Sequence, residues 1–219
     1  MVKRVVLFDV DGVLVDSLRA HLQVCEDLRE AYSLNIRIPT PGEFRSIARS
    51  GTRISPMKEF FRAVGFPEDR LDDAGSYYQE NFSKKYAISP FPGIPQMLGR
   101  LHANGVLMGL ATANVRANVE KAIGDSWRLF APRYCYTYDH PRKFTKAEAL
   151  RDASAALNLR SEEMLYVGDQ LGDFQAARDA GTEFLGVTWG WVIARGDSGF
   201  PTVDEPADIG DYVLNESKP

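Results

Sequence analysis

Cysteine is scarce in this sequence of 219 residues. The only two, Cys25 and Cys135, are far apart in the chain and have no metal-binding spacing. Because free cysteines are commonly buried, we expect both to be buried thiols. The sequence therefore gives no sign of a transition-metal site built from cysteine and histidine.

Long apolar runs and concentrated positive charge are also missing. The N-terminal apolar run Val5–Phe8, with Val2 before it, is too short for a signal sequence or a membrane span. We therefore expect a cytoplasmic protein without a membrane partner. The net charge is −4 and the Lys and Arg residues are dispersed. Because no positive field would hold a polyanion, we do not expect a nucleic-acid partner.

What the sequence does contain is an alternation of short apolar runs with segments of helical periodicity. This order predicts βαβ units, and so an α/β fold with a parallel sheet covered by helices. The expected strands are Val5–Phe8, Val106–Ala111, Tyr134–Tyr136, Met164–Val167 and Phe184–Val187. The expected crossover helices include residues 94–101, 147–157 and 174–180.

The region between Ser17 and Phe91 breaks this alternation, because it shows helical stripes but no convincing buried strand. We predict an α-helical domain of residues 17–91, inserted into a core of residues 1–16 and 92–219. Asp16–Ser17 offers a helix N-cap at one border, and the Pro/Gly-rich segment Ser89–Gly93 marks the other.

Two carboxylates follow the first expected strand. Asp9 and Asp11 are two residues apart, so in an extended chain they could point the same way, and Gly12 permits a sharp turn behind them. Asp-Gly is also a frequent turn pair, so a simple turn is the alternative interpretation. Two close carboxylates repel each other, and a hard divalent cation such as Mg2+ would offset their charge.

A second carboxylate pair, Asp169 and Asp173, follows the expected strand Met164–Val167. Ligands of open α/β sheets gather at the carboxyl ends of the strands. Two strands thus deliver acids to one edge of the predicted sheet, which weakens the simple-turn interpretation. Asp173 has two alternative roles, as a support for a metal site and as an N-cap for the following helix.

In four segments the chain resembles the haloacid dehalogenase-like hydrolase superfamily, and within it the phosphoglycolate phosphatase-like branch with an α-helical cap. The superfamily has an Asp-x-Asp-Gly loop, a strand-end Thr or Ser, a Lys, and a Gly-Asp-x-x-x-Asp loop. These motifs are matched in order by Asp9–Gly12, Thr112, Lys146 or Lys143, and Gly168–Asp173. The resemblance implies a Rossmann-like core with an inserted cap, which is matched only in position and size.

The resemblance also implies a phosphatase mechanism. Asp9 would be the nucleophile that forms an aspartyl-phosphate, and Asp11 would protonate the leaving group and then activate water. Mg2+ would be held by Asp9, the backbone carbonyl of Asp11, and Asp169, with Asp173 as a supporting acid. Dehalogenating relatives lack an acid at the position of Asp11, so its presence favours phosphate-ester chemistry.

Thr112, Asn114 and one lysine would complete the site. Thr112 ends an apolar strand, so its hydroxyl could reach a phosphoryl oxygen at the N-terminus of the next helix. Asn114 would contact the substrate or cap that helix. Lys146 immediately precedes the expected helix 147–157, as in relatives whose lysine opens it, whereas Lys143 fits an alternative alignment. The lysine would offset the charge of the acids.

The expected activity is Mg2+-dependent hydrolysis of a small phosphorylated metabolite, because a closing cap leaves little room for a phosphoprotein. Two alternatives stay open. One is a sugar phosphomutase of the same superfamily, and the other is a binding protein that keeps the fold without catalysis. The sequence specifies neither the physiological substrate nor the oligomeric state.

Arginines recur at a spacing of four in the predicted insert. Arg45 and Arg49 would share one helix face, Gly51 would end that helix, and Arg53 would follow in a loop. Because arginine suits bidentate recognition of a carboxylate, we expect an acidic phosphoester such as phosphoglycolate, with a solvated basic surface as the alternative. The role of the loop Trp189–Trp191 is left open.

Overall fold

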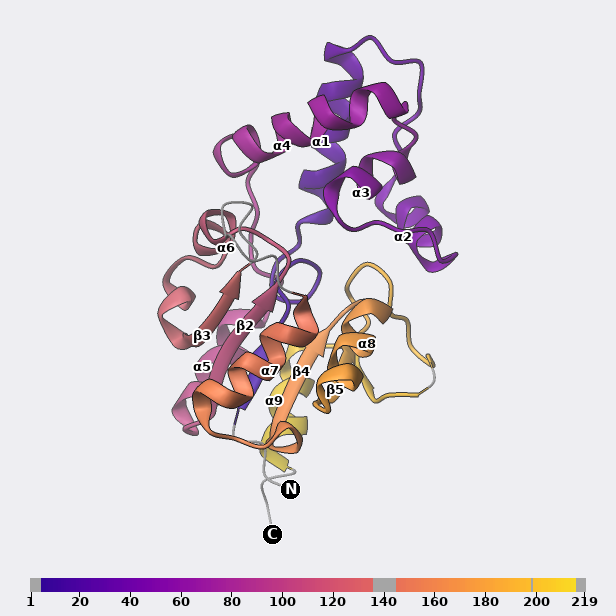
Figure 1. The fold of residues 1–219 in the computed structure, drawn as a ribbon. Helices are drawn as coiled ribbons and strands as arrows, with labels where there is room; N and C mark the ends of the chain where they lie inside the picture. Colours follow the sequence, from indigo (N-terminus) through magenta and orange to yellow (C-terminus); the bar gives the residue numbers. More distant parts are fainter. Residues whose placement is uncertain (1–4, 136–144, 198, 216–219) are drawn as a thin grey trace. The chain divides into compact units, whose positions relative to one another are not determined.

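The computed structural model describes residues 5–135, 145–197 and 199–215, with the backbone alone at residue 215 (Figure 1). The chain divides into two compact units. The sheet unit comprises Met1–Asp16 and Ser89–Pro219, and the helical insert comprises Ser17–Ile88. Residues 89–91, which the sequence assigns to the insert, belong to the sheet unit.

Within the described residues, six strands form one parallel sheet in the order β3-β2-β1-β4-β5-β6. The central strand β1 pairs with β2 on one side and with β4 on the other, so that Val5 lies opposite both Leu107 and Met164. All four β1 residues are fully buried, as expected for a strand covered on both faces. The strands are β1 Val5–Phe8, β2 Leu107–Thr112, β3 Phe130–Cys135, β4 Met164–Gly168, β5 Glu183–Val187 and β6 Thr202–Val203.

Helices cover both faces of this sheet. Helices α7 and α8 pack together on one face, and α5 and α9 pack together on the other (Figure 1). One core cluster joins Leu7 of β1 and Tyr166 of β4 to Leu150 of α7 and Ala177 of α8. The helices of this unit are α5 Ile94–Ala103, α6 Arg116–Ile123, α7 Lys146–Leu157, α8 Leu171–Ala180 and α9 Pro206–Asn215.

The helical insert has an aromatic core of its own. The Phe60 ring lies 4.5 Å from the Phe44 ring, and the Phe82 ring stacks on Tyr78 at 4.4 Å. His21 is buried among these rings, where its Nδ1 contacts the Ser17 carbonyl at 2.7 Å and its Nε2 contacts the Tyr78 hydroxyl at 3.1 Å. The insert consists of α1 Leu18–Ala31, α2 Pro41–Arg49, α3 Met57–Val64, the 3-10 turn Glu68–Arg70 and α4 Leu71–Lys85.

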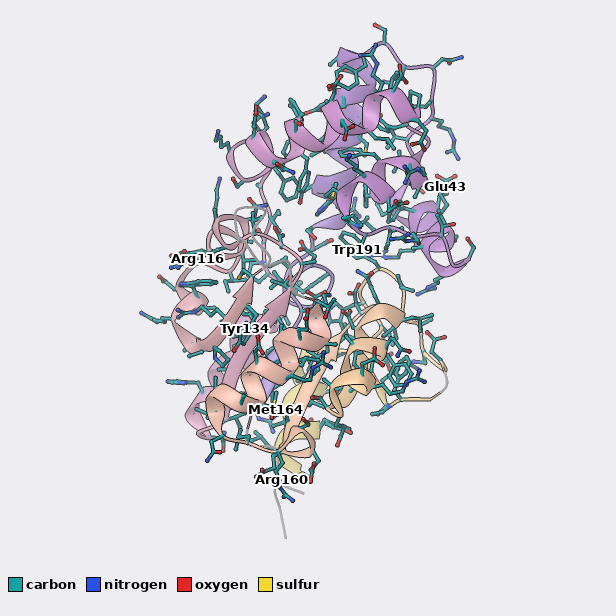
Figure 2. All side chains as sticks on the ribbon, in the orientation of Figure 1. Glu43, Arg116, Tyr134, Arg160, Met164 and Trp191 are labelled. Atoms are coloured by element: carbon teal, nitrogen blue, oxygen red, sulfur yellow. The ribbon has the colours of Figure 1, made fainter. Side chains whose placement is uncertain are left out.

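Local sequence signals define one helix start in the insert but not another. Thr40 and Glu43 form a capping box at α2, in which each side chain accepts from the other's backbone N–H, and Glu43 is labelled in Figure 2. Ser17 precedes α1, but its side chain makes no capping hydrogen bond. The sequence-based N-cap position is therefore right at Ser17, but the expected side-chain cap is missing, since Ser17 has helical backbone angles and its hydroxyl is buried.

The two ends of the insert leave the sheet unit next to each other. The backbone N–H of Asp16 donates to the carbonyl of Ser89 at 3.0 Å, and that of Phe91 donates to Leu14 at 3.0 Å. An isolated antiparallel bridge joins Val15 to Pro90 between these contacts. The chain therefore enters and leaves the insert through a short paired segment.

The predicted Rossmann-like α/β fold with a helical insert is confirmed, but several boundaries differ. Strand β3 begins at Phe130 rather than at Tyr134, because an edge strand accommodates Pro132 and the exposed Arg133, which interrupt the apolar pattern. Tyr136 lies outside the described residues. Helix α8 begins at Leu171, three residues before the expected start.

The two cysteines differ in burial. Cys25 is buried as expected, whereas Cys135 is only partly buried because it ends the edge strand β3. No helix in the described part of the chain combines the length and apolar character needed to span a membrane.

Candidate active site

Asp9 stands directly at the end of β1. Its backbone N–H donates to the Val167 carbonyl at 2.9 Å, which extends the β1–β4 ladder by one residue, and the residue is 3% exposed. The chain then turns back, because the N–H groups of Leu14 and Val15 donate to the Val10 carbonyl at 2.9 and 3.1 Å. This turn places Asp11 just beyond the strand end.

Asp169 and Asp173 come from β4 and the first turn of α8. The Oδ2 of Asp173 accepts from the backbone N–H groups of Asp169 at 3.2 Å and Gln170 at 3.1 Å. It thereby satisfies donors at the start of α8, where Gln170 is the N-cap residue. Asp173 is therefore not the N-cap residue that the sequence offered as one of its roles, but the third helical residue, whose side chain completes the capping box. Its other oxygen, Oδ1, contacts a lysine.

That lysine is Lys146, the first residue of α7. A capping box formed by Thr145 and Glu148 fixes the start of this helix. The Lys146 ammonium donates to Asp9 Oδ2 at 2.8 Å and to Asp173 Oδ1 at 2.6 Å. The alternative lysine, Lys143, lies outside the described residues.

Burial and the repulsion of nearby carboxylates oppose ionisation of Asp169 and Asp173. Burial, together with the charges of Asp173 and Asp9, raises the pKa of the Asp169 carboxyl well above its ordinary value. Burial also raises the pKa of Asp173, although the Lys146 ammonium opposes this shift. Burial alone would lower the pKa of Lys146, but the charges of Asp173 and Asp9 outweigh it and hold that pKa well above its usual range.

The negative charge of the three buried acids that Lys146 does not offset is suited to binding a cation. Asp9, Asp169 and Asp173 bring carboxylate oxygens within 4.8 Å of one another, and all three residues are buried. The Oδ1 of Asp169 is buried without a hydrogen-bond partner in the described structure. An orphaned carboxylate oxygen beside other oxygen donors is suited to a hard cation such as Mg2+. The side chain of Asp173, which the sequence placed in a supporting role, is thus part of this cluster of acids. The side chain of Asp11 is not.

Asp11 is instead tied to the end of β2. Its Oδ2 accepts from the side-chain amide of Asn114 at 2.7 Å, while its Oδ1 is buried and accepts no hydrogen bond from the described residues. The Oδ1 of Asn114 accepts in turn from the Asn118 side chain at 3.0 Å and from the Val115 backbone at 2.8 Å. Asn114 is not the N-cap residue of α6, because that position is held by Val115.

Thr112 and Tyr166 complete the polar environment. The Thr112 hydroxyl oxygen accepts from the Asn114 backbone N–H at 3.2 Å, and Thr112 is 4% exposed. The Tyr166 hydroxyl donates to the Ala111 carbonyl at 2.8 Å, and its oxygen lies 3.3 Å from Asp173 Oδ1. Sequence reasoning missed Tyr166, although a tyrosine within the apolar strand Met164–Gly168 is a signal that its hydroxyl needs a partner.

Arg53 belongs to the helical insert. It is exposed and lies in the segment between α2 and α3, after Gly51, whose φ of 90° follows the end of α2. The expected break after Arg49 is therefore present. A role of Arg53 in substrate recognition stays a prediction.

Comparison with known proteins identifies relatives over nearly the whole chain. Residues 6–187 match the haloacid dehalogenase-like hydrolase family. An N-acetylmuramic acid 6-phosphate phosphatase from Pseudomonas aeruginosa is 25% identical over 216 residues, covering 96% of this chain and 89% of that protein. A phosphoglycolate phosphatase from Salmonella typhi is 29% identical over 214 residues, covering 86% and 82%.

Solved structures share the fold as well. A haloacid dehalogenase-like family hydrolase from Streptococcus pneumoniae superposes with a TM-score of 0.71 at 20% sequence identity, covering 95% of this chain and 97% of that one. At this identity the likeness concerns the fold alone. The match of residues 6–187 to the family confirms the resemblance seen in the four sequence motifs.

Proposed function

The chain belongs to the haloacid dehalogenase-like hydrolase family, and on this premise we propose that it is a Mg2+-dependent phosphatase acting through an aspartyl-phosphate on Asp9. One observation carries the proposal. The buried Asp9 carboxylate is held by Lys146 beside Asp169 and Asp173 at the carboxyl end of the sheet. The curated relatives, which are phosphatases, support the reaction class.

Asp9 and Asp11 divide the chemistry. An Asp9 oxygen attacks phosphorus and forms a P–O bond as the bond to the leaving oxygen breaks, and Asp11 gives that oxygen its proton. Asp11, now ionised, takes a proton from water, whose oxygen attacks phosphorus and releases Asp9 and inorganic phosphate. Asn114 orients Asp11 through Oδ2, and Oδ1 accepts no hydrogen bond from the described residues, as a proton-transfer atom requires.

Lys146 and Thr112 stabilise the transferred group. Lys146 supplies a positive charge next to the attacking carboxylate, where it offsets charge developing on the phosphoryl oxygens. Because the Thr112 oxygen already accepts a backbone hydrogen bond, its own proton is available to a phosphoryl oxygen.

Asp9 and Asp169 would hold Mg2+, together with the backbone carbonyl of Asp11, and Asp173 would keep Asp169 and Lys146 in position. The cation would supply charge that neutralises the phosphate oxygens. The acid set fits this role, because its oxygen donors are hard and Asp169 Oδ1 has no hydrogen bond from the described chain. Mg2+ typically takes one or two carboxylates together with water and phosphate oxygens.

Asp9→Asn tests the nucleophile. The amide has nearly the same shape but does not attack phosphorus, so we expect turnover to fall by more than about 10⁴-fold with the fold intact. Phosphate release from a panel of phosphorylated metabolites is the measurement, and Asp152→Asn, on the exposed side of α7, is the control. Near wild-type turnover by Asp9→Asn would falsify the mechanism.

The same panel separates the two alternatives. A sugar phosphomutase would give a bisphosphate-dependent isomer of a sugar phosphate as its product rather than free phosphate. A binding protein without catalysis would release no phosphate from any compound with Mg2+ present.

For the substrate we propose a small phosphoester that also carries a carboxylate. The named substrates of the two curated relatives, N-acetylmuramic acid 6-phosphate and phosphoglycolate, are both acids. Arg53 offers a guanidinium for bidentate recognition of such a group, from an exposed position in the insert.

Arg53→Ala tests this assignment on phosphoglycolate, a neutral sugar phosphate and p-nitrophenyl phosphate. We expect kcat/KM to fall for phosphoglycolate and to stay unchanged for the other two. Arg37→Ala is the control, because Arg37 is exposed and paired with Glu43. An equal effect on all three compounds, or none, would contradict a role in acid recognition.

A further inference from the structure

The loop after β5 contains Trp189, Gly190 and Trp191, and the proposed reaction gives it no role; Trp191 is labelled in Figure 2. We propose that this loop positions the cation ligand Asp169 and fastens it to the turn that follows Asp9. The inference rests on the proposed function, because it takes Asp169 as a ligand of a hard divalent cation.

The first observation is the way Asp169 is anchored. The Trp191 backbone N–H donates to Asp169 Oδ2 at 2.7 Å, and the Ile193 N–H donates to the Asp169 carbonyl at 2.9 Å. The Asp169 residue is fully buried, and its Oδ1 accepts no hydrogen bond in the described structure. The loop therefore occupies one carboxylate oxygen and leaves the other to a ligand, because a buried carboxylate oxygen without any partner is costly.

The second observation is the close approach of Gly190. A Cβ at this position would lie less than 3.0 Å from Asp169 Cβ, from Asp169 Oδ2 and from the Gly12 carbonyl oxygen. The φ of Gly190 is outside the left-handed region, so a backbone conformation that disfavours other residues does not explain the glycine. Because Gly190 has no side chain, the loop can contact Asp169 and, at the same time, Gly12 in the turn that follows Asp9.

The third observation links the loop to the Asp9 side. The indole Nε1 of Trp189 donates to the Val13 carbonyl at 3.1 Å, and the Trp189 ring meets Phe91 edge to face at 6.4 Å. Val13 lies in the turn that directly follows Asp9 and Asp11. The loop thus bridges the two chain segments that deliver the acids, and so fixes the separation of Asp169 from Asp9.

Gly190→Ala is the principal test. The methyl group must displace Asp169 or Gly12, so we expect the Kd for Mn2+, measured on the metal-free full chain by calorimetry, to rise about 10–100-fold. Gly99→Ala in α5 is the matched control, because a Cβ there meets nothing within 4 Å. Circular dichroism and a thermal melt check that both variants are folded.

Trp189→Phe is the second variant, and it decides the matter if Gly190→Ala does not fold. It keeps a ring against Phe91 but removes the donor to Val13, so we expect Mn2+ to bind severalfold more weakly and saturating Mg2+ to restore most of kcat. Trp127→Phe is the control, because the Trp127 ring contacts Arg116 and Arg133 elsewhere on the sheet unit.

The outcomes separate this inference from the proposed function. If folded Gly190→Ala, or Trp189→Phe in its place, binds Mn2+ as tightly as the wild type, the positioning role is wrong and the phosphatase proposal stands. If the wild type itself binds neither Mn2+ nor Mg2+, the cation site fails and the inference fails with it.

Discussion

The sheet unit and the helical insert differ in whether they bury charged side chains. The sheet unit buries three carboxylates, Asp9, Asp169 and Asp173, around one lysine. In the insert, residues 17–88, no carboxylate, lysine or arginine is buried, and its ion pairs lie at the surface. Its interior is aromatic, built around rings such as Phe44, Phe60 and Phe82.

The two units therefore differ in how their buried groups contribute to the free energy of folding. Burying carboxylates opposes folding unless partners offset their charge, whereas burying phenylalanine favours it. The insert follows the ordinary rule for a stable core. The sheet unit departs from it at one edge, and groups held in such unfavourable environments are concentrated at functional sites.

Removal of the cation that the buried acids would bind should have the largest effect on activity. We expect EDTA to abolish phosphate release and added Mg2+ to restore it, because the one lysine that pairs with these acids among the described residues does not neutralise three carboxylates. Ca2+ should bind but support turnover poorly, since it takes more ligands in a looser arrangement than Mg2+ and would hold the attacking Asp9 carboxylate less precisely. Full activity in excess EDTA, with no metal found by elemental analysis, would contradict the cation site.

Asp11→Asn should have the next largest effect. Loss of a general acid and base reduces turnover by about 10²–10⁴-fold, and we expect kcat to fall while the melting temperature stays close to the wild type. Steady-state kinetics with p-nitrophenyl phosphate, whose leaving group needs little protonation, provides the contrast. A smaller loss on this substrate than on an alkyl phosphate identifies the acid step, and equal losses would argue against it.

Phe60→Ala should lower the stability of the insert, because it removes a ring from the aromatic core. Phe60 is fully buried, and its ring lies 4.5 Å from Phe44 and 5.4 Å from His21. Truncation leaves a cavity, and we expect the free energy of unfolding of the insert to fall by about 3–5 kcal/mol. Hydrogen exchange of α1 and α3 amides measures this, and unchanged protection would show that the aromatic core is dispensable.

Arg62→Ala should have the smallest effect. Arg62 pairs with Glu59 at 2.6 Å and with Glu68 at 2.5 Å, and its side chain is 42% exposed. Water screens these pairs, so we expect no measurable change in chemical denaturation. A clear loss of stability would mean that surface charge contributes to the insert as well.

Much of this contrast could be predicted from the sequence. Asp9 and Asp169 each follow an apolar strand, and parallel strands end at the same edge, so their proximity follows from the pattern and the topology. The aromatic stripes of α3 and α4 follow from helical periodicity.

Other features depend on contacts that no local pattern records. The hydrogen bond from Asn114 to Asp11 joins residues that follow two different strands, β2 and β1, and Asn118, one helical turn later, fixes the orientation of the Asn114 side chain. Strand β6 has only two residues, Thr202–Val203, too few for a period-2 signal. The approach of Gly190 to Asp169 exists only once β4 and β5 pair.

The paired segment at the base of the insert has a consequence for how the length of the insert can vary. Because Asp16 and Ser89 are hydrogen-bonded to each other, the two ends of residues 17–88 are held together like those of a closed loop. Each doubling of the length of such a loop adds only about 0.6 kcal/mol of closure entropy. We therefore expect that an insert of different length, joined at the same two residues, would change the closure entropy of the sheet unit by little.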